Sequence, residues 1–464
     1  MQIAQRLSLI LLLISNSISN AGPLDFYYQN KQLPTAPSSV QVQMFKQLLN
    51  HIKPDKGSFN QRYYIDETYG PNNDAPVFFY ICGQNTCTPN VLTGAIREYA
   101  QKYHAKLVAL EHRYYGESIP VANFSVKEMR FLKTERVLGD LANFQQQISS
   151  EKKWTGRWIA FGSSYAGSLA AYYRLHYPQL IAGAIASSAP VMATNNFYEY
   201  DKEVTQQAGT QCAQAIRNVV SDIESNLNNP SNLAHYKALF GVSKVKNPID
   251  LLSLIADVAA VSIQQGHKEE FCSALLSSFS PVEAYAQFAK NVYKEMHITA
   301  YDLTPQAALS EKVQDYKHDF GLRQWYYQSC TEYGDWQNAN PNPFLTTRSL
   351  LINAKYHQEV CKRLFGITSL ANTELINKTY YLPLRTSKAS HIYFTNGELD
   401  AWSHLSMTEA NNNTENTQLY YYEIVQGKQS DDLLARNTAD SKSLQFARTM
   451  TELLNQEWMV GCLD

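Results

Sequence analysis

The sequence predicts a mostly parallel α/β sheet whose chain is interrupted by a long helical insert. Three observations lead to this fold class: several short apolar runs end at turn residues, helical patterns lie between them, and one long central stretch holds no such run. Continuous apolar runs are typical of strands that are buried on both faces, as in parallel sheets. Their alternation with helices indicates successive strand–helix–strand units.

The first half of the sequence supplies four candidate strands. They are short and largely apolar, at residues 76–82 (PVFFYIC), 106–111 (KLVALE), 158–161 (WIAF) and 181–186 (IAGAIA). Helical patterns lie between these strands. The first is at residues 136–150, between the second and third strands, where apolar side chains recur every three or four positions. A second helical pattern, at 166–177, starts directly after the third strand and ends before Pro178.

The central stretch has a different character. From about residue 194 to 336 the apolar periodicity is helical, for example at 211–227 and 248–265, and strand-like runs are missing. Two further candidate strands then follow, at 391–395 (HIYFT) and 419–425 (LYYYEIV). The strand pattern is thus interrupted and then resumes.

This pattern predicts the domain organisation. A final helix at 443–458 completes the chain. We expect residues 22–193 and 337–464 to form one split α/β domain, with residues 194–336 inserted as a mostly helical cap.

The balance of charges excludes some functional classes. The chain carries 40 Lys and Arg residues against 42 Asp and Glu residues, for a net charge of −2, so no nucleic-acid partner is expected. With 44% hydrophobic and 18% charged residues, the composition fits a globular protein rather than a disordered one. Nothing in the sequence indicates an oligomeric state.

Residues 1–21 have the pattern of a secretory signal peptide. Arg6 precedes an apolar run at 7–14, and Ser19-Asn20-Ala21 offers small residues for cleavage. The run is too short to span a bilayer, and no later stretch approaches the roughly 18 apolar residues of a membrane helix. We therefore expect a protein of the secretory pathway with no membrane span.

Seven cysteines and three glycosylation sequons fit an oxidising compartment. Because seven is odd, at least one cysteine is free or pairs with another molecule, and spacing alone leaves the connectivity open. Cys82 and Cys87 are close enough in sequence for a small local bridge. The sequons are hypotheses of surface glycosylation, at Asn123, Asn377 and Asn412.

The sharpest local signal is residues 162–167 (GSSYAG), which lie between a predicted strand and a predicted helix. This is the setting of a nucleophile elbow, a tight turn that exposes a serine at the carboxyl edge of the sheet. Ser164 would be the nucleophile, and the backbone N–H of Tyr165 the first donor of the oxyanion hole. An ordinary Gly/Ser turn is the alternative interpretation.

Triads of this kind follow the chain order Ser, acid, His. Asp400, soon after the 391–395 strand, is placed to be the acid, although an exposed turn carboxylate would have the same sequence context. The histidine should follow the next strand, but the last histidine of the sequence is His404, close behind Asp400. His404 would reach Ser164 only in unusual geometry, so it is at best a weak substitute base.

Six separated blocks, in order along the chain, form a pattern that is more specific than the elbow alone. They are 59–64 (FNQRYY), 111–118 (EHRYYGES), 162–174 (GSSYAGSLAAYYR), 186–190 (ASSAP), 328–334 (QSCTEYG) and 396–402 (NGELDAW). Together they resemble the serine carboxypeptidase family that contains prolyl carboxypeptidase, dipeptidyl peptidase II and, most similar, the thymus-specific serine protease. The resemblance implies an α/β-hydrolase fold with a mostly helical cap. It also implies a serine exopeptidase that acts on peptides near proline, without a cofactor, in lysosomes, endosomes or outside the cell.

The resemblance assigns roles to individual residues. Ser164 matches the family nucleophile and Asp400 the family acid. The glycine-rich oxyanion segment falls around Gly83, the expected second donor, where this sequence departs from the family pattern. Cys330 and Cys361 match positions that are paired in relatives.

The family histidine lies in a Gly-x-His-x-x-Asp-Leu-like segment after the last strand. Here residues 427–433 read GKQSDDL, so Gln429 stands at the histidine position. A glutamine forms hydrogen bonds but cannot take a proton near pH 7. Loss of the histidine from a comparable triad lowers kcat by about 10⁶, or about 8 kcal/mol of barrier. Binding and the oxyanion hole would leave a residual rate about 10³–10⁴ above that in water.

Two residues of these blocks are candidates for binding substrate. Glu332 would hold the amino terminus of a peptide, or alternatively form a structural ion pair, and Trp402 lies beside the expected acid. His112 and Arg113 would line the pocket or form a buried hydrogen-bonded brace. No metal site is expected, because the sequence has neither a His-Glu-x-x-His motif nor paired Cys-x-x-Cys motifs.

Three hypotheses about function follow. The first is a serine exopeptidase-like protein with acyl-enzyme chemistry at Ser164, impaired by Gln429. The second is a catalytically inactive relative that binds peptides or a protein partner. The third is an esterase or lipase on the same fold, which the family blocks support least.

Overall fold

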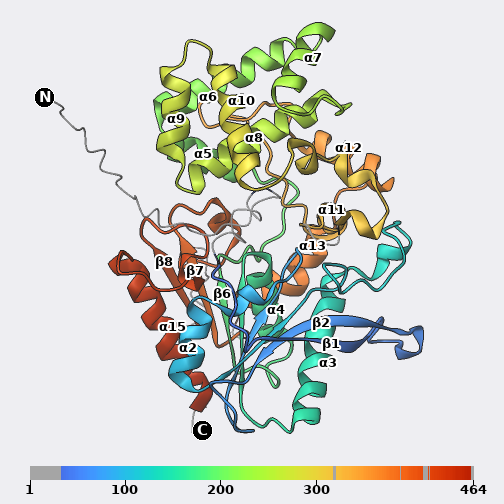
Figure 1. The fold of residues 1–464 in the computed structure, drawn as a ribbon, viewed down its shortest axis with the longest axis vertical. Coiled ribbons are helices and arrows are strands. Elements are labelled where there is room, and N and C mark those ends of the chain that lie inside the picture. Colours follow the sequence, from blue (N-terminus) through green and yellow to red (C-terminus); the bar gives the residue numbers. More distant parts are fainter. Residues whose placement is uncertain are drawn as a thin grey trace, which may run out of the picture.

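The computed structural model describes residues 24, 33–316, 320–386, 388–410, 416 and 418–460, and its centre is an eight-stranded sheet (Figure 1). The strands lie in the order β1-β2-β4-β3-β5-β6-β7-β8. Neighbours from β4 to β8 are parallel, whereas β1–β2 and β2–β4 are antiparallel. The strands are β1 (Gln41–Leu48), β2 (Ser58–Asp66), β3 (Val77–Ile81), β4 (Lys106–Leu110), β5 (Trp158–Ser163), β6 (Gly183–Ser187), β7 (Ile392–Gly397) and β8 (Leu419–Ile424).

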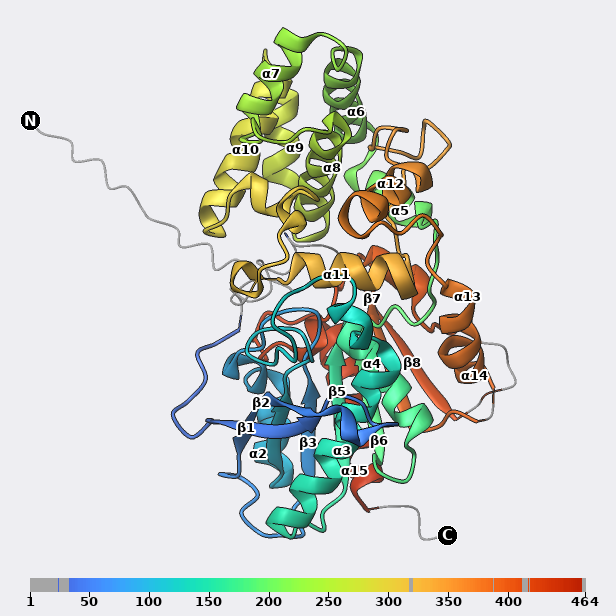
Figure 2. The ribbon, with the colours of Figure 1, turned by 90° about the vertical axis from the view of Figure 1, so that its right-hand side faces the viewer.

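Helices cover both faces of this sheet (Figures 1 and 2). One face carries α2 (Ala95–Tyr103) and α15 (Lys442–Val460), and the other carries α3 (Thr134–Lys152) and α4 (Tyr165–His176). Successive residues of β3 point to opposite faces, so Phe78 packs in the core with α2 and α15, and Phe79 in the core with α3 and α4. A parallel sheet covered in this way, with this strand order, is the α/β-hydrolase fold.

The six strands expected from continuous apolar runs are present as β3 to β8. The hairpin of β1 and β2 was not among the predicted strands. Half of the residues of β1 are exposed at the edge of the sheet, and the first part of β2 alternates between exposed and buried residues. An antiparallel edge hairpin needs no apolar run on both faces, so the signal that reveals the buried parallel strands is missing here.

A second layer of helices lies between β6 and β7 in the chain. We call α5 to α12 the cap helices: α5 (Tyr198–Ala208), α6 (Thr210–Ser225), α7 (Pro230–Leu239), α8 (Pro248–Gln264), α9 (Lys268–Ser277), α10 (Pro281–Glu295), α11 (Leu322–Gln328) and α12 (Ala354–Phe365). In Figure 2, α11 crosses between the sheet below and helices α6 to α10 above. Trp402 follows β7 and makes an edge-to-face contact with Tyr200 of α5, so the cap helices lie over the carboxyl ends of the strands.

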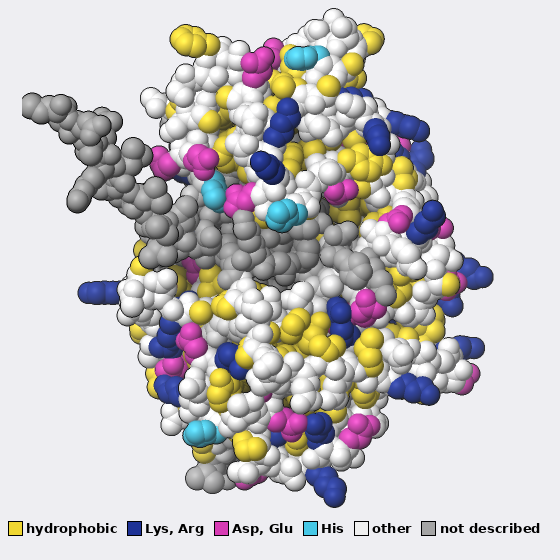
Figure 3. Space-filling model, in the orientation of Figure 1, with side chains coloured by type: hydrophobic (Ala, Val, Ile, Leu, Met, Phe, Trp, Pro, Cys, Tyr) yellow, Lys and Arg dark blue, Asp and Glu magenta, His cyan; other side chains and the backbone are white. Residues whose placement is uncertain are grey.

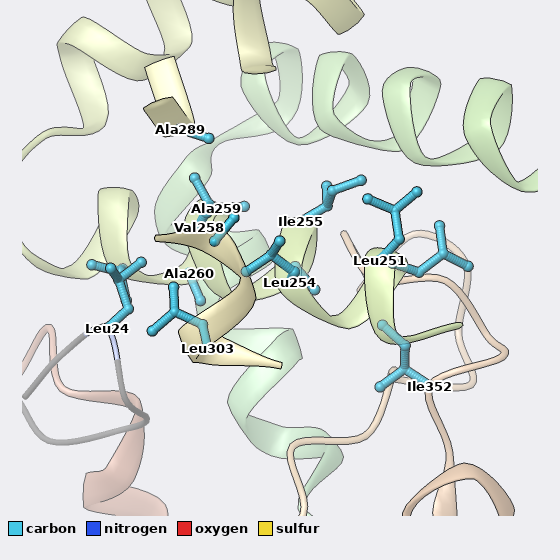
Figure 4. Packing of buried hydrophobic residues seen from close by; sticks show 14 of the residues in the cluster. Leu24, Leu251, Leu254, Ile255, Val258, Ala259, Ala260, Ala289, Leu303 and Ile352 are labelled. Carbon is cyan, nitrogen blue, oxygen red and sulfur yellow. The ribbon is translucent and has the colours of Figure 1, made fainter. Parts of the chain in front are cut away.

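Helix α8 is the centre of the cap. It is buried along most of its length, as expected for a helix that is apolar on nearly all sides. Figure 4 shows Leu251, Leu254, Ile255 and Val258 of this helix packed among apolar neighbours that include Ile352. Buried residues of α12 belong to the same core, so the packing extends the cap beyond residue 336. The insert boundaries themselves stay a prediction.

Short helices complete the connections. Two π-helical segments are η7 (Ser329–Tyr333) and η8 (Asn377–Tyr381), beside the short helices α13 (Thr373–Ile376) and α14 (Leu382–Leu384). Two 3-10 helices follow the last two strands: η9 (Ala401–Leu405) after β7 and η10 (Asp431–Leu433) after β8. The remaining 3-10 helices are η1 (Pro54–Lys56), η2 (Pro89–Leu92), η3 (Glu128–Phe131), η4 (Ala300–Leu303), η5 (Ala307–Leu309) and η6 (Val313–Tyr316).

Three disulfides join residues of the described chain, in the pairs Cys82–Cys87, Cys212–Cys272 and Cys330–Cys361. The second ties α6 to α9, and the third ties η7 to α12, as the resemblance implied. The seventh cysteine, Cys462, lies outside the described residues, as do the predicted signal segment 1–21 and Asn412.

The described surface mixes charges of both signs. On the face drawn in Figure 3, basic and acidic side chains are interspersed with apolar ones, in keeping with the near-neutral net charge. None of the helices in the described part of the chain combines the length and apolar content that a bilayer crossing requires. Within the same residues, no three His, Cys, Asp or Glu side chains gather in a way that would hold a metal ion.

Candidate active site

Ser164 occupies a strained turn between β5 and α4. Its φ of 54° and ψ of −126° lie in a region that residues other than glycine rarely adopt. The turn is tight, because a Cβ on Gly162 would approach the carbonyl oxygen of Ala166 to 2.1 Å. The Ser164 N–H donates to Ser187 O of the neighbouring strand at 2.9 Å. This is the geometry of a nucleophile elbow, which was the prediction for this segment.

Gln429 faces the serine from the loop after β8. Its Nε2 lies 3.4 Å from Ser164 Oγ, and the two residues are 1% and 2% exposed. The flanking backbone is fixed on both sides, since Ser430 N–H donates to Ser188 Oγ and Lys428 N–H donates to Asp431 Oδ2, each at 2.8 Å. The amide is therefore positioned to donate to the Ser164 oxygen, but it cannot accept the hydroxyl proton near neutral pH.

Asp400 caps η9 directly after β7. Its Oδ1 accepts the Trp402 N–H at 3.0 Å, while its buried Oδ2 has no hydrogen-bond partner among the described residues. Burial raises the pKa of Asp400 to about 7, although hydrogen bonds from the Trp402 amide and the Ser188 hydroxyl act in the opposite direction. In an intact triad, an imidazole N–H would satisfy this acid. Here the acid is buried without that partner.

His404 lies on the cap side of this loop. Its Nε2 is 3.3 Å from Glu203 Oε2 of α5, and its side chain is 38% exposed. This contact is the main reason that the pKa of Glu203 is lowered. The imidazole is thus engaged with Glu203 at the surface, and its role as a substitute base stays a prediction.

The two expected oxyanion donors lie near each other. Tyr165 starts α4, so its N–H belongs to the free amino end of that helix. Gly83 lies over the same turn, since a Cβ built on it would be 3.8 Å from Ala166 N. An oxyanion between these backbone groups would also be favoured by the helix dipole.

The loop that carries Gly83 is held firmly despite its unusual sequence. The Cys82–Cys87 disulfide closes it. Cys87 O accepts from Arg62 Nη2 at 2.9 Å and from Tyr64 OH at 2.7 Å, while Cys87 N–H donates to the buried Glu111 at 3.0 Å. These contacts fix the position of Gly83 by a local bridge and a buried ion pair of Arg62 with Glu111.

His112 and Arg113 form the buried brace that was one of their two predicted roles. Arg113 makes a bidentate contact with Asp140, with both nitrogen–oxygen distances at 2.6 Å. His112 Nε2 lies 3.1 Å from Tyr165 OH, and burial lowers the pKa of His112 to about 4. A neutral His112 therefore supports the Tyr165 ring beneath the elbow.

Glu332 has a different partner from either prediction. Its Oε2 accepts from the N–H and the hydroxyl of Thr134, each at 3.1 Å, so it caps the start of α3 instead of pairing with a cation. Burial raises the pKa of Glu332 to about 7. Trp402, the other candidate, packs in tilted and edge-to-face contacts against Phe197 and Tyr200, with ring centroids 5.2 and 5.6 Å away.

The described sequons differ in their surroundings. Asn123 is exposed, and its side chain accepts the Ser125 N–H at 3.0 Å. Asn377 is half-buried and both accepts from Ala193 N and donates to Ala193 O at 2.8 Å. Attachment of a glycan therefore suits the environment of Asn123 better than that of Asn377.

Ser188 is the part of this site that sequence reasoning missed. It is buried with a positive φ of 47°, accepts the N–H that follows Gln429 and lowers the pKa of Asp400. It thus connects the acid to the loop that faces the nucleophile. The block 186–190 contained the signal, but no role was assigned to it.

Comparisons with known proteins agree with this geometry. The family model described as serine carboxypeptidase S28 matches residues 47–451. The chain is 32% identical over 374 residues to a "Probable serine protease EDA2" of Arabidopsis thaliana, covering 78% of this chain and 75% of that protein. It is 28% identical over 460 residues to the "Thymus-specific serine protease" of Homo sapiens, covering 92% and 88%. It is 27% identical over 470 residues to the "Lysosomal Pro-X carboxypeptidase" of Mus musculus, covering 92% and 91%. With a match over most of its length and a nucleophile elbow at the expected place, the chain belongs to the serine carboxypeptidase S28 family.

Proposed function

We propose that this protein is a serine exopeptidase-like member of its family, directed at peptides near proline, whose catalysis is impaired because Gln429 replaces the general base. One observation carries the proposal: the Gln429 amide lies 3.4 Å from Ser164 Oγ, where a histidine would have to lie. The signal pattern, the disulfides and the lysosomal relative favour a site of action in the secretory pathway, outside the cell or in lysosomes.

The remaining machinery would act as in other enzymes of this type. Ser164 Oγ would attack the scissile carbonyl, and the N–H groups of Tyr165 and Gly83 would stabilise the oxyanion. Asp400 would orient and stabilise a protonated base, but Gln429 offers it none. Acyl-enzyme formation would therefore be slow, because no group takes the Ser164 proton as the bond forms.

The first test is labelling of the full-length secreted protein by a fluorophosphonate probe, which reports activation of the serine without a known substrate. We expect slow labelling that is absent in Ser164→Ala. Labelling as fast as that of an active family member would show that a base serves Ser164 and would contradict the impaired mechanism. Thermal melts of both proteins exclude misfolding as the cause of a weak signal.

A catalytically inactive, peptide-binding protein is the second candidate function. It is favoured by the burial of Ser164, Asp400 and Gln429 together with the missing base. This candidate predicts no labelling at all in folded protein, together with measurable binding of proline-containing peptides by calorimetry. Ser164-dependent cleavage of any X-Pro or Pro-X peptide at pH 4–8 would exclude it.

A further inference from the structure

A cavity of about 80 Å³ lies where the cap helices meet the carboxyl edge of the sheet. Residues of α8, α11, α12 and η9 line it, among them Asp257, Trp325, Trp336, Arg348 and Trp402. A cavity of this size holds on the order of five water molecules, or one residue of a peptide. Its aromatic walls and few charged groups are typical of a small-ligand site.

This cavity borders both halves of the candidate active site. The Trp325 ring packs against Tyr165, which follows the nucleophile, with centroids 5.3 Å apart. Trp402 lies two residues after Asp400, and its N–H donates to Oδ1 of Asp400, the N-cap of η9, at 3.0 Å. The wall of the cavity thus contacts the neighbours of Ser164 and Asp400 in the chain, although neither residue lines the cavity itself.

The cation of the cavity wall is already satisfied. Arg348 donates to Gln337 O at 3.2 Å and to Gln337 Oε1 at 3.0 Å, and it lies 3.4 Å from Asp257 Oδ1. Only 3% of its side chain is exposed. Its guanidinium is thus poorly placed to receive a carboxylate from a ligand.

Asp257 presents the opposite case. Its side chain is 35% exposed. Burial raises the pKa of Asp257, and the neighbouring Arg348 acts in the opposite direction. Of this ion pair, the carboxylate of Asp257 is therefore the member that a ligand in the cavity can reach. A cation beside Asp257 would gain from the carboxylate and from the faces of Trp325 and Trp336.

The other titratable groups in the cavity wall add no positive charge beside Asp257. Asp335 accepts the Thr194 N–H at 3.1 Å, and burial raises the pKa of Asp335 well above its ordinary value. Burial and Arg348 lower the pKa of His357 to about 3, so its imidazole is neutral at physiological pH. Two wall nitrogens, His357 Nε2 and Trp402 Nε1, are buried without a partner among the described residues.

We propose that this cavity binds the free amino end of a peptide, with the terminal ammonium group against Asp257. The proposal rests on the function proposed above in that the ligand is a peptide. It does not depend on whether Ser164 cleaves that peptide. It means that ligands enter this site by the amino end rather than the carboxyl end. Asp257 is then a specificity-determining residue of the cap.

The test measures binding to full-length Ser164→Ala, in which turnover plays no part. The probes are the peptide Ala-Pro-Gly-Gly with a free amino end and its N-acetyl derivative, titrated by calorimetry. N-acetylation should weaken binding about 10- to 100-fold, the range for loss of a hydrogen bond to a charged group. Asp257→Asn should weaken binding of the free peptide by a similar factor and leave the acetylated peptide unchanged. Asp55→Asn, at an exposed site on η1, is the matched control and should change neither.

The ligand comparison uses the unaltered cavity, so it stands even if Asp257→Asn fails to fold. Equal affinity for the free and acetylated peptides, or no binding of either, would overturn the proposal. So would loss of binding on amidation of the carboxyl end instead, because that result assigns recognition to a cation. Since Ser164 is absent from these experiments, fluorophosphonate labelling decides the proposed function separately.

Discussion

Two regions of the candidate site, the turn that carries Ser164 and the loop after β8 that carries Gln429, are both held by many contacts. On the nucleophile side, the strained Ser164 turn, the amino end of α4 and the Gly83 loop are all in place. On the base side, the loop after β8 is equally well fixed, and Asp432 accepts hydroxyl hydrogen bonds from Ser187 and Thr395 of two neighbouring strands. The side chain that this loop directs at Ser164 is the amide of Gln429. The contacts that hold the loop come from Lys428, Ser430 and Asp432, so its geometry does not depend on an imidazole at position 429.

Restoring the base should produce the largest effect. In Gln429→His, Ser164-dependent turnover of Pro-X or X-Pro peptides should rise by at least about 10³-fold and at most about 10⁶-fold, because an imidazole would accept the serine proton. The measurement is kcat/KM, with Gln429→Asn as the matched amide control and Ser164→Ala in the His background. An unchanged rate in folded protein would mean that the two sides differ by more than this residue.

The burial of Asp400 should make the stability of the protein depend on pH. The folded-state pKa of Asp400, about 7, is above the ordinary value of 3.8, so the folded protein holds this proton more tightly. The free energy of unfolding should therefore fall as pH rises from about 4 to about 7, by up to about 4 kcal/mol. Asp400→Asn should remove this decline, as measured by urea unfolding between pH 4 and 8.

The same experiment in Gln429→His sharpens the comparison. An imidazolium beside Asp400 would lower the pKa of that acid, so the decline in stability should become smaller. A decline of equal size in wild type and Asp400→Asn would show that other buried acids cause it. Glu332, whose pKa is also raised to about 7, is the first of these.

The smallest effect is expected at His404. Its contact with Glu203 is a partly exposed pair, so His404→Ala should cost at most about 1 kcal/mol of stability and should leave the fluorophosphonate labelling rate unchanged. Labelling rates and thermal melts of the variant and the wild type check both statements. A clear drop in labelling would restore His404 as a candidate base.

The predictability of the fold from sequence depends on burial. Strands β3 to β7 are buried almost throughout, so each leaves a continuous apolar run that can be recognised. The hairpin of β1 and β2 lies at the sheet edge and leaves no such run. The packing of α12 with α8 depends on contacts between distant segments, which periodicity does not reveal.

The residues of the site also differ in how far the sequence predicts them. The elbow has a local sequence pattern, and a simple count shows that no histidine follows His404 in the sequence. Ser188 acts through a hydrogen bond to the Gln429 loop that only the folded sheet creates. The pairing of Asp257 with Arg348 joins α8 to a segment far along the chain, so no motif predicts the cavity they line.

The position of the cap helices in the chain has a consequence for biosynthesis. Strand β6 pairs directly with β7, but all the cap helices are synthesised between them. A nascent chain that has formed β3 to β6 must therefore expose the β6 edge until β7 leaves the ribosome, which favours slow folding and dependence on chaperones. Asp400 follows β7, and Gln429, which faces Ser164, follows β8. The candidate site is therefore assembled only after the cap helices and both of these strands have been made.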